Sequence, residues 1–548
     1  MNVRAIPAAP ALPPPAASRL GAWLAVLAAL LWIPQAALLA ALVADIADGA
    51  TAAAALPPAL GALSLGLLRA GLDAAAARFV FAAARAETSR LRREAVAALA
   101  CRSPLDPGRP ASGAAAAAVT EQAEAVLPYL ARFRPVRLRA AVVPPVILVA
   151  VLTQSWLAAL ILLIAAPLIP LFMALIGLRA KEASEAQMLE IGGMNALLLD
   201  RLRGLATIRA FDAVAATAVR LHAAADSLRR RSMAVLRIAF LSSAVLELFA
   251  SLGVAMVAVY VGFHLLGTLE FGAWEERMGL GPALFVLLLA PAFFEPLRDL
   301  AAAWHDKAAG EAALAALRDL AAPPAFALPA ALASPTLRTA PAALAVSVRG
   351  LVFRYPGAPR PVFDGLDLAV AAGERVALLA PSGGGKSTLL ALLAGLALPG
   401  AGEIRIGDVP LEDATAADIR ARIAWLGQRP ALFAASLQAN ILLGRRDLAH
   451  EAELCRRRLL PALPPSRPIG EDGAGLSGGE ALRVGLARAL VSPSVGLLLA
   501  DEPTAHLDRD TAAAATEALL AAAEGRTLIL ATHDPELAAR MDRVVRLA

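Results

Sequence analysis

Long apolar stretches constrain this chain more than any other feature of its sequence. Of its 548 residues, 59% are hydrophobic and only 18% are charged, a composition too apolar for a soluble protein. Six stretches hold close to the ~20 apolar residues that a helix needs to cross ~30 Å of hydrocarbon. They cover residues 20–44, 56–77, 136–152, 156–178, 235–266 and 280–303. The sequence therefore predicts an all-α, six-helix transmembrane domain embedded in a lipid bilayer.

The charged residues between these stretches predict the orientation in the membrane. The connection after the first stretch carries Asp45 and Asp48 without a basic residue, whereas those after the second and fourth are rich in arginine, for example Arg90 and Arg229–Arg231. The positive-inside rule places both termini and both long connections in the cytosol. This distribution also assigns the net charge of +5 to a membrane surface rather than to nucleic acid. Apolar residues at helical spacing in the long connections predict that the spans continue beyond the bilayer, although a solvated helical hairpin gives the same spacing.

A few ionisable residues lie inside the predicted spans: Arg69, Asp73, Glu247, His264 and Glu295. Such groups are costly in lipid and are expected to face a cavity or another helix. Arg69 and Asp73 are four residues apart and share one helix face. Two interpretations are equally open: polar contacts for a transported substrate, or an internal Arg69–Asp73 ion pair.

The composition changes along the chain predict four segments. Residues 1–19 are rich in proline and are expected to form a disordered cytosolic leader before the transmembrane domain, 20–321. A Pro/Ala-rich linker, 322–344, separates that domain from an α/β domain, 345–548. Short β-like runs alternate there with helical stretches, as in a parallel sheet with crossover helices. These runs are 346–353, 376–379, 423–426, 497–500 and 527–531.

A glycine-rich turn follows the second of those runs and predicts a phosphate-binding loop. It extends from Ala380 to Thr388 and includes Ser382, Gly383, Gly384, Gly385, Lys386 and Ser387. Backbone N–H groups at the start of a helix would bind phosphate, with Lys386 on the terminal phosphates and Ser387 on Mg²⁺. The chain has only three lysines, so the presence of one here favours this interpretation over a chance turn. The two cysteines, Cys101 and Cys455, are far apart, and no disulfide is expected.

Polar residues follow the other strands at the same predicted sheet edge. Asp501 and Glu502 end an apolar strand, and they are suited to holding Mg²⁺ and to polarising a water molecule, respectively. Gln428 is expected to sense metal and water, and His533 to contact a γ-phosphate oxygen. Each of these residues alone is a weak signal, because polar groups are common at strand ends.

The segment Leu476-Ser-Gly-Gly-Glu480 closely resembles the signature sequence of ATP-binding cassette (ABC) proteins. With the loop, the Asp501–Asp508 segment and Tyr355 where an adenine-stacking aromatic is expected, the resemblance covers residues 345–548. It implies a P-loop cassette that hydrolyses ATP with Mg²⁺. In this family two cassettes enclose two ATP molecules head to tail, so the resemblance assigns Ser477, Gly478, Gly479 and Glu480 to the ATP on the partner's loop. One cassette after six spans implies an exporter-type half-transporter.

Three membrane segments, 199–211, 239–249 and 285–299, are similar to the CydD half of the bacterial CydDC family. That resemblance implies a heterodimer with a CydC-like chain in the inner membrane, export of the small thiols cysteine or glutathione, and support of cytochrome bd assembly. The alternatives are a haem transporter, a drug or lipid exporter, and a regulatory membrane protein that binds ATP without pumping.

The sequence departs from the ABC pattern at three places. Ala380 replaces the first glycine of the loop, Glu480 stands where glutamine is usual, and the segment from Gln428 to Leu476 is short for the helical subdomain. Alanine disfavours a positive φ, so a different loop entry is expected at Ala380. Because Lys386 and Glu502 are present, an active rather than a degenerate hydrolysis site is predicted.

Overall fold

The structure is a computed structural model. It describes residues 16–168 apart from 111, 204–329 apart from 275, 276 and 325, and 342–547 apart from 382, 429, 493 and 506, with only isolated positions between 169 and 203. These residues form two compact units. The membrane unit comprises the described residues up to Ala95 with Gly113–Leu320, and the cassette unit comprises Val96–Ser112 with the residues from Ala321 onward.

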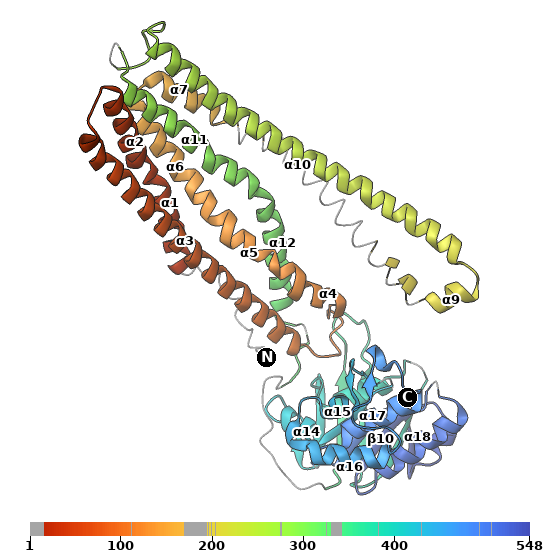
Figure 1. Cartoon of the computed structure of the whole chain (residues 1–548). Helices are drawn as coiled ribbons and strands as arrows, with labels where there is room; N and C mark the ends of the chain where they lie inside the picture. Colours follow the sequence, from red (N-terminus) through yellow and green to blue (C-terminus); the bar gives the residue numbers. More distant parts are fainter. Residues whose placement is uncertain are drawn as a thin grey trace. The chain divides into compact units, whose positions relative to one another are not determined.

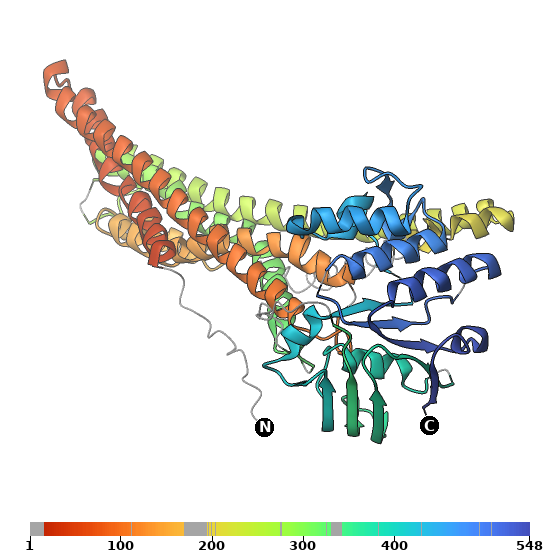
Figure 2. The same cartoon turned by 90° about the horizontal axis from the view of Figure 1, so that it is seen from below.

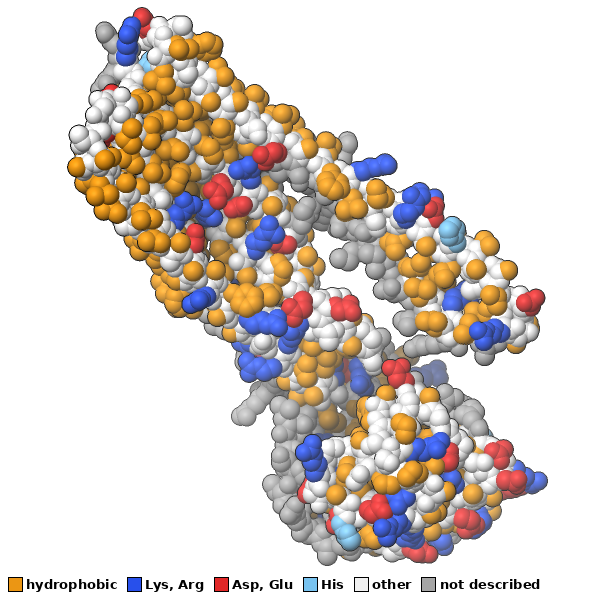
Figure 3. Space-filling model, viewed as in Figure 1, with side chains coloured by type: hydrophobic (Ala, Val, Ile, Leu, Met, Phe, Trp, Pro, Cys, Tyr) orange, Lys and Arg blue, Asp and Glu red, His pale blue; other side chains and the backbone are white. Residues whose placement is uncertain are grey.

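Helices make up the membrane unit (Figure 1). The longer ones are α1 (Ala16–Leu30), α2 (Trp32–Ala47), α3 (Ala52–Ala100), α6 (Arg134–Leu152), α7 (Trp156–Ala165), α10 (Val214–Leu265), α11 (Leu280–Ala302) and α12 (Trp304–Ala321). The described residues also form short helices α4 (Ser112–Ala117), α5 (Val126–Pro128) and α9 (Leu205–Ala210) and two π-helical turns, Ala118–Gln122 and Tyr129–Phe133. In the view of Figure 3, hydrophobic side chains gather on the upper left part of this unit, over α1, α2 and α3.

Within the described residues, five helical segments are long and apolar enough to cross a membrane. They include the predicted first, second, third and sixth spans, and the predicted fifth span in part, as Glu247–Leu265. The predicted fourth span begins with α7, and its part beyond residue 168 lies largely outside the described residues. Residues 16–19, assigned above to a disordered leader, are instead helical, because α1 already begins at Ala16. Residues 1–15 lie outside the described part of the chain.

The first span is interrupted between Leu30 and Trp32. Pro34 explains the break, because its ring clashes with the carbonyl of the residue four positions earlier, Leu30, where α1 ends. By contrast, α3 and α10 run unbroken for 49 and 52 residues. At 1.5 Å per residue each is roughly 75 Å long, more than twice the thickness of the hydrocarbon layer. Helices of this length agree with the prediction that spans continue beyond the bilayer, which stays a prediction.

One apolar core joins α1, α2, α6, α7, α10 and α11. It includes Ile147, Leu162, Val257, Leu289 and Phe294, which are at most 1% exposed. On α10 the buried core residues begin at Ala250, and the first half of this helix extends away from the other helices of the unit in Figure 1. Among the described residues, the core packing of α10 therefore lies in its second half.

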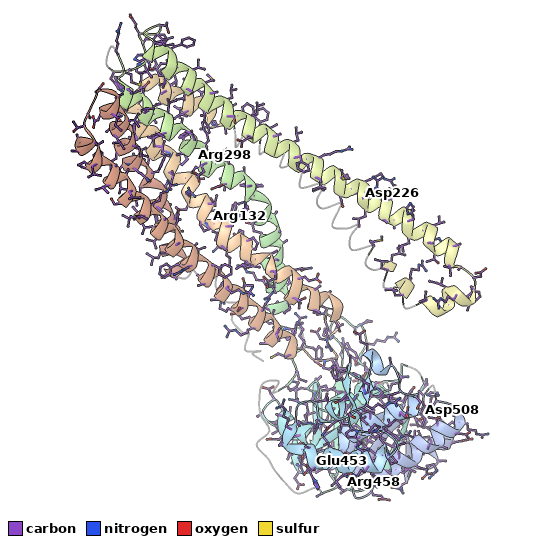
Figure 4. All side chains as sticks on the ribbon, in the orientation of Figure 1. Arg132, Asp226, Arg298, Glu453, Arg458 and Asp508 are labelled. Carbon is purple, nitrogen blue, oxygen red and sulfur yellow. The ribbon has the colours of Figure 1, made fainter. Side chains whose placement is uncertain are left out.

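Three of the ionisable residues predicted inside the spans have polar partners. Glu247 of α10 accepts from Arg298 of α11 at 3.1 Å, and Arg298 is labelled in Figure 4. Glu295 accepts from Arg139 of α6 at 3.3 Å. The ring Nε2 of His264, which is 3% exposed, accepts from the backbone N–H of Met278 at 3.1 Å.

The cassette unit contains two main β-sheets (Figure 2). An antiparallel sheet has the order β2-β1-β4-β5, and a parallel sheet has the order β11-β3-β10-β9-β6. The strands are β1 (Val346–Phe353), β2 (Phe363–Val370), β3 (Arg375–Leu379), β4 (Ala401–Ile406), β5 (Val409–Pro410), β6 (Ile423–Leu426), β9 (Leu497–Asp501), β10 (Thr527–Thr532) and β11 (Arg543–Arg546). The predicted strand 346–353 exists, but its assignment to the parallel sheet is wrong, because it pairs antiparallel with β2 and β4.

The helices of this unit are α13 (Lys386–Leu393), α14 (Ala416–Ala421), α15 (Leu437–Leu442), α16 (Ala449–Leu459), α17 (Gly478–Leu490), α18 (Arg509–Ala522) and α19 (Pro535–Ala538), with 3₁₀ turns at Arg446–Leu448 and Glu471–Gly473. The short segment between Gln428 and Leu476 forms α15, α16 and a two-stranded sheet of β7 (Ala435–Ser436) and β8 (Pro468–Ile469). Residues of α15, α16 and α17 share one apolar core with the parallel sheet, so this reduced subdomain is packed.

Candidate functional site

The glycine-rich loop connects β3 to α13, as the sequence predicts. Gly383 and Gly385 have φ values of +83° and +81°, which side chains other than glycine rarely adopt. Gly384 is constrained differently, because a Cβ there would lie 2.7 Å from the Cβ of Ala380. Ala380 itself is not among the residues with positive φ. Ala380 therefore fits the loop without left-handed backbone, and the missing side chain of Gly384 makes room for its Cβ.

Lys386 lies folded over this loop and is only 6% exposed. Its Nζ donates to the carbonyl oxygen of Ala380 at 2.7 Å and lies 3.7 Å from a carboxylate oxygen of Glu502. A cation held by a carbonyl at the end of a parallel strand is well placed to exchange that contact for a phosphate oxygen. Ser382, also predicted to bind ATP, lies outside the described residues.

Asp501, the last residue of β9, is hydrogen-bonded to the side chain of Ser387. Burial raises the pKa of Asp501, and the neighbouring Glu502 raises it further, whereas the Ser387 hydrogen bond and Lys386 lower it. A nearby divalent cation stabilises the ionised form of a half-buried carboxylate, which burial alone disfavours. Carboxylate and hydroxyl oxygens are also the hard ligands that Mg²⁺ prefers, so the two residues fit this metal.

Glu502 and His533 meet on the other side of Lys386. A carboxylate oxygen of Glu502 lies 3.3 Å from Nδ1 of His533, which follows β10. Glu502 has a φ of +45°, and its N–H donates to the carbonyl of Ala531 at 2.8 Å. Both residues line a pocket of about 330 Å³, together with Thr504 and Asp534.

Tyr355 and Thr388 contact each other at the edge of the loop. The Tyr355 hydroxyl and Thr388 Oγ1 are 2.9 Å apart, and the tyrosine ring packs edge-on against Phe353. This places Tyr355 next to the first turn of α13. Gln428 follows β6, which pairs in parallel with β9, so it lies at the same sheet edge as Asp501. Its side chain is exposed and makes no hydrogen bond to any described residue.

The signature segment forms the N-terminus of α17. Ser477 Oγ accepts from the N–H of Glu480 at 3.3 Å, and a Glu480 carboxylate oxygen accepts from the N–H of Ser477 at 2.8 Å. This reciprocal capping box explains why glutamate is stable where glutamine is usual. The backbone hydrogen bond from Ser477 lowers the pKa of Glu480. A Cβ on Gly479 would lie 2.5 Å from Thr511 of α18, so this glycine also permits close packing of the two helices.

The structure brings together most of the predicted site but not all of it. Lys386, Ser387, Asp501, Glu502 and His533 form one connected cluster. Among the described residues, no hydrogen bond or ion pair links the signature segment to this cluster. Thr504 and Asp534 line the pocket and were not predicted. The sequence signal that could have identified them is their position just after the ends of β9 and β10.

Family models match the sequence in both units. The model for the ABC transporter transmembrane region matches residues 20–274, and the model for the ABC transporter matches residues 363–505.

Individual proteins refine this match. The glutathione/L-cysteine transport system ATP-binding/permease protein CydD of Escherichia coli (strain K12) is 40% identical over 443 residues, which are 78% of this chain and 73% of that protein. The corresponding CydC protein of Bacillus subtilis (strain 168) is 30% identical over 433 residues, which are 76% of this chain and 72% of that protein.

A solved structure shares the fold over almost the whole length. A bacterial Atm1-family ABC exporter with ATP bound superposes with a TM-score of 0.72 at 24% identity, covering 97% of this chain and 93% of that one. The fold is therefore that of an ABC exporter, and the cassette is an ATPase coupled to transport. This chain belongs to the ABC transporters and, because its identity to CydD exceeds its identity to CydC, to the family of the CydD ATP-binding/permease proteins within them.

Proposed function

We propose that this chain is one half of an ATP-driven exporter of cysteine or glutathione in the bacterial inner membrane, acting in support of cytochrome bd assembly. The observation that carries the proposal is the 40% identity along 78% of the chain to a CydD protein named for transport of these thiols. The similarity includes a membrane match as well as a cassette match, so it extends beyond the ATP site.

Hydrolysis is proposed to proceed on the cluster around Lys386. The backbone N–H groups of residues 383–388 and the Lys386 ammonium bind the phosphates. Glu502 accepts a proton from the attacking water, and His533 holds the carboxylate of Glu502 and contacts the γ-phosphate. Gln428 is proposed to complete this site from the end of β6, and Tyr355 to stack on the adenine.

Mg²⁺ fits the site because a half-buried carboxylate and a hydroxyl are hydrogen-bonded side by side. Ser387, Asp501 and Gln428 would hold the ion, which when bound neutralises charge on the β- and γ-phosphates. With the ion bound, the Asp501 carboxylate would stay ionised next to Glu502, and Lys386 would exchange the Ala380 carbonyl for a phosphate oxygen.

A CydC-like chain is the proposed partner. Ser477, Gly478, Gly479 and Glu480 lie at a helix N-terminus that can bind the γ-phosphate of an ATP on the partner's loop. The arginine-rich cytosolic connections support an orientation with both termini and the cassette in the cytoplasm. The need for a second chain follows from one cassette and one membrane domain in this chain.

Transport by the reconstituted pair tests the proposed function. The chain is co-reconstituted with its CydC-like partner in proteoliposomes, and ATP-dependent uptake of labelled cysteine, glutathione and haem is measured side by side. Thiol uptake that is lost in Lys386→Ala is expected. Lys307→Ala is the control, because this lysine lies 4.8 Å above the ring of Trp304, outside the ATP site. Uptake of haem alone, or of a lipid or drug in place of a thiol, would contradict the proposal.

A further inference from the structure

Arg69 lies on the protein-facing side of α3. Four leucines at helical spacing on this helix, Leu56, Leu60, Leu63 and Leu67, are 54–67% exposed and mark the side that faces lipid. At 100° per residue, Arg69 points roughly opposite to this stripe. It shares its side of the helix with Ala62 and Ala76, which are 4% and 3% exposed. The arginine is therefore directed toward other helices and not toward lipid.

The surroundings of Arg69 fix its position without neutralising its charge. Its guanidinium lies 5.3 Å from the centre of the Trp32 ring, at the start of α2. The Trp32 indole donates to the carbonyl of Leu288 on α11 at 3.2 Å, so this aromatic platform is itself held in place. A cation–π contact stabilises an arginine, but it supplies no negative charge. A cation at this depth is costly unless an anion reaches it.

Gln35, one turn after Trp32 on α2, carries a buried acceptor where α2 meets α3. Gln35 of α2 donates its amide to the carbonyl of Ala62 at 3.1 Å, and its Oε1 is buried without a hydrogen-bond partner. Gly66 leaves the space for this side chain, because a Cβ there would lie 2.8 Å from the Gln35 amide nitrogen. The Gln35 side chain therefore holds α2 close against α3.

Asp73 follows Arg69 by one helical turn, and its side chain is exposed. Within the described part of the chain neither residue forms an ion pair, so the internal Arg69–Asp73 pair considered above is not present. Among the described residues, α3 thus carries a cation without an ion-pair partner and, one turn further on, an exposed carboxylate without one. Opposite charges one turn apart, with Cβ atoms about 5–6 Å apart, match a ligand that carries both charges on one carbon.

We propose that Arg69 and Asp73 bind the zwitterionic α-amino-acid group of the transported thiol. Arg69 donates to the α-carboxylate, and Asp73 accepts from the α-ammonium. This inference rests on the proposed function and specifies its substrate chemistry. Free cysteine and the γ-glutamyl end of glutathione both carry this group, whereas haem has carboxylates but no ammonium.

Competition for labelled cysteine uptake tests the site in proteoliposomes containing the chain and its partner. N-acetylcysteine, which has no ammonium, and cysteamine, which has no carboxylate, are each expected to compete at least about tenfold more weakly than unlabelled cysteine, because each loses a charged hydrogen bond. This arm needs no substitution and is therefore independent of folding defects.

Substitutions assign each charge. Arg69→Gln is expected to remove the preference for cysteine over cysteamine, and Arg69→Lys to retain part of it. Asp73→Asn is expected to remove the preference over N-acetylcysteine. Arg78→Gln is the matched control, because Arg78 is an exposed arginine on the leucine side of the same helix.

The outcomes separate this site from the proposed function. Equal competition by all three compounds on the unaltered pair would overturn the site, because neither charge would then be recognised. Reduced uptake with unchanged preferences in Arg69→Gln would also overturn it and would show that Arg69 has a structural or lipid-binding role. Absence of uptake of any thiol by the unaltered pair would contradict the proposed function and, with it, the proposed binding site.

Discussion

Glu502 holds a backbone conformation that few residues with a side chain adopt. Its φ of +45° costs on the order of 1 kcal/mol, and its N–H is tied to the Ala531 carbonyl. This geometry directs the carboxylate toward both Lys386 and His533, at 3.7 and 3.3 Å. The strain is thus located at the residue proposed to activate water.

Glu502→Gln is expected to slow ATP hydrolysis by at least about 100-fold, because the amide cannot accept the proton of the attacking water. ATP binding should persist, since Lys386 and the loop are unchanged. The measurement is ATPase activity of the pair, with the partner's own hydrolysis site inactivated, alongside equilibrium binding of ATP.

Glu524→Gln is the control for this substitution. Its side chain is 78% exposed in the same unit and is far along the sequence from the loop. If Glu502→Gln hydrolyses ATP at the unaltered rate, the assignment of Glu502 is wrong.

Asp501 gives a prediction about pH. Burial raises its pKa above the ordinary 3.8, so folding disfavours the ionised carboxylate. The resulting penalty is present above the folded-state pKa and absent below the unfolded value. Without nucleotide and metal, Asp501→Asn should raise the melting temperature at pH 7 by a few degrees, and this gain should vanish below about pH 4. Thermal unfolding across this pH range measures the gain in melting temperature, and an equal melting temperature at pH 7 would contradict the prediction.

The same Asp501→Asn variant should lose Mg²⁺-dependent ATP hydrolysis.

At the scale of elements, the turn between α6 and α7 is fixed by one buried serine. Ser155 is 0% exposed, caps α7 by accepting from Ala158 N–H at 3.1 Å, and donates to the Gly272 carbonyl at 2.6 Å. The Tyr260 hydroxyl lies 3.0 Å from the same oxygen. One side chain therefore joins α7, α10 and the segment that leads into α11.

Ser155→Ala is expected to destabilise the membrane unit by about 1–3 kcal/mol, because it leaves buried polar groups without partners. Thr153→Ala is the matched control, since Thr153 is exposed and its hydroxyl donates to the nearby Ala150 carbonyl. Thermal unfolding of the detergent-solubilised pair compares the two. Equal stability of both variants would show that the Ser155 contacts do not hold these helices together.

At the scale of the whole molecule, the ATP site is proposed to be completed by a second chain. Ser477→Ala should then reduce hydrolysis at the partner's loop more than hydrolysis at Lys386 of this chain. Nucleotide trapping resolved by subunit measures the two sites separately.

Ser436→Ala is the matched control for that experiment. Ser436 caps α15 of the same unit by accepting from Ala439 N–H at 3.2 Å, so it reproduces the loss of a helix cap without touching the signature. Equal loss at both sites in Ser477→Ala would contradict completion of the site by the second chain.

The sequence determined the features that depend on neighbouring residues. Span positions follow from apolar length, and the loop follows from glycines that reach positive φ at Gly383 and Gly385. The break in the first span is likewise local, because Pro34 disrupts the turn that contains Leu30. The positions of Asp501, Glu502 and His533 at strand ends were also predictable, since parallel strands end at one edge.

Only the tertiary structure decided the pairings between distant segments. The strand pattern of β1 does not specify its partners, and the structure places it in the antiparallel sheet. Likewise the connection after α3 belongs to the cassette unit, where Ser103 donates to the Leu396 carbonyl at 2.6 Å. Spacing alone allowed Arg69 to pair with Asp73, yet Trp32 from another helix lies against it. Periodicity and turn chemistry are properties of a short window, whereas these contacts depend on which surfaces the folded chain brings together.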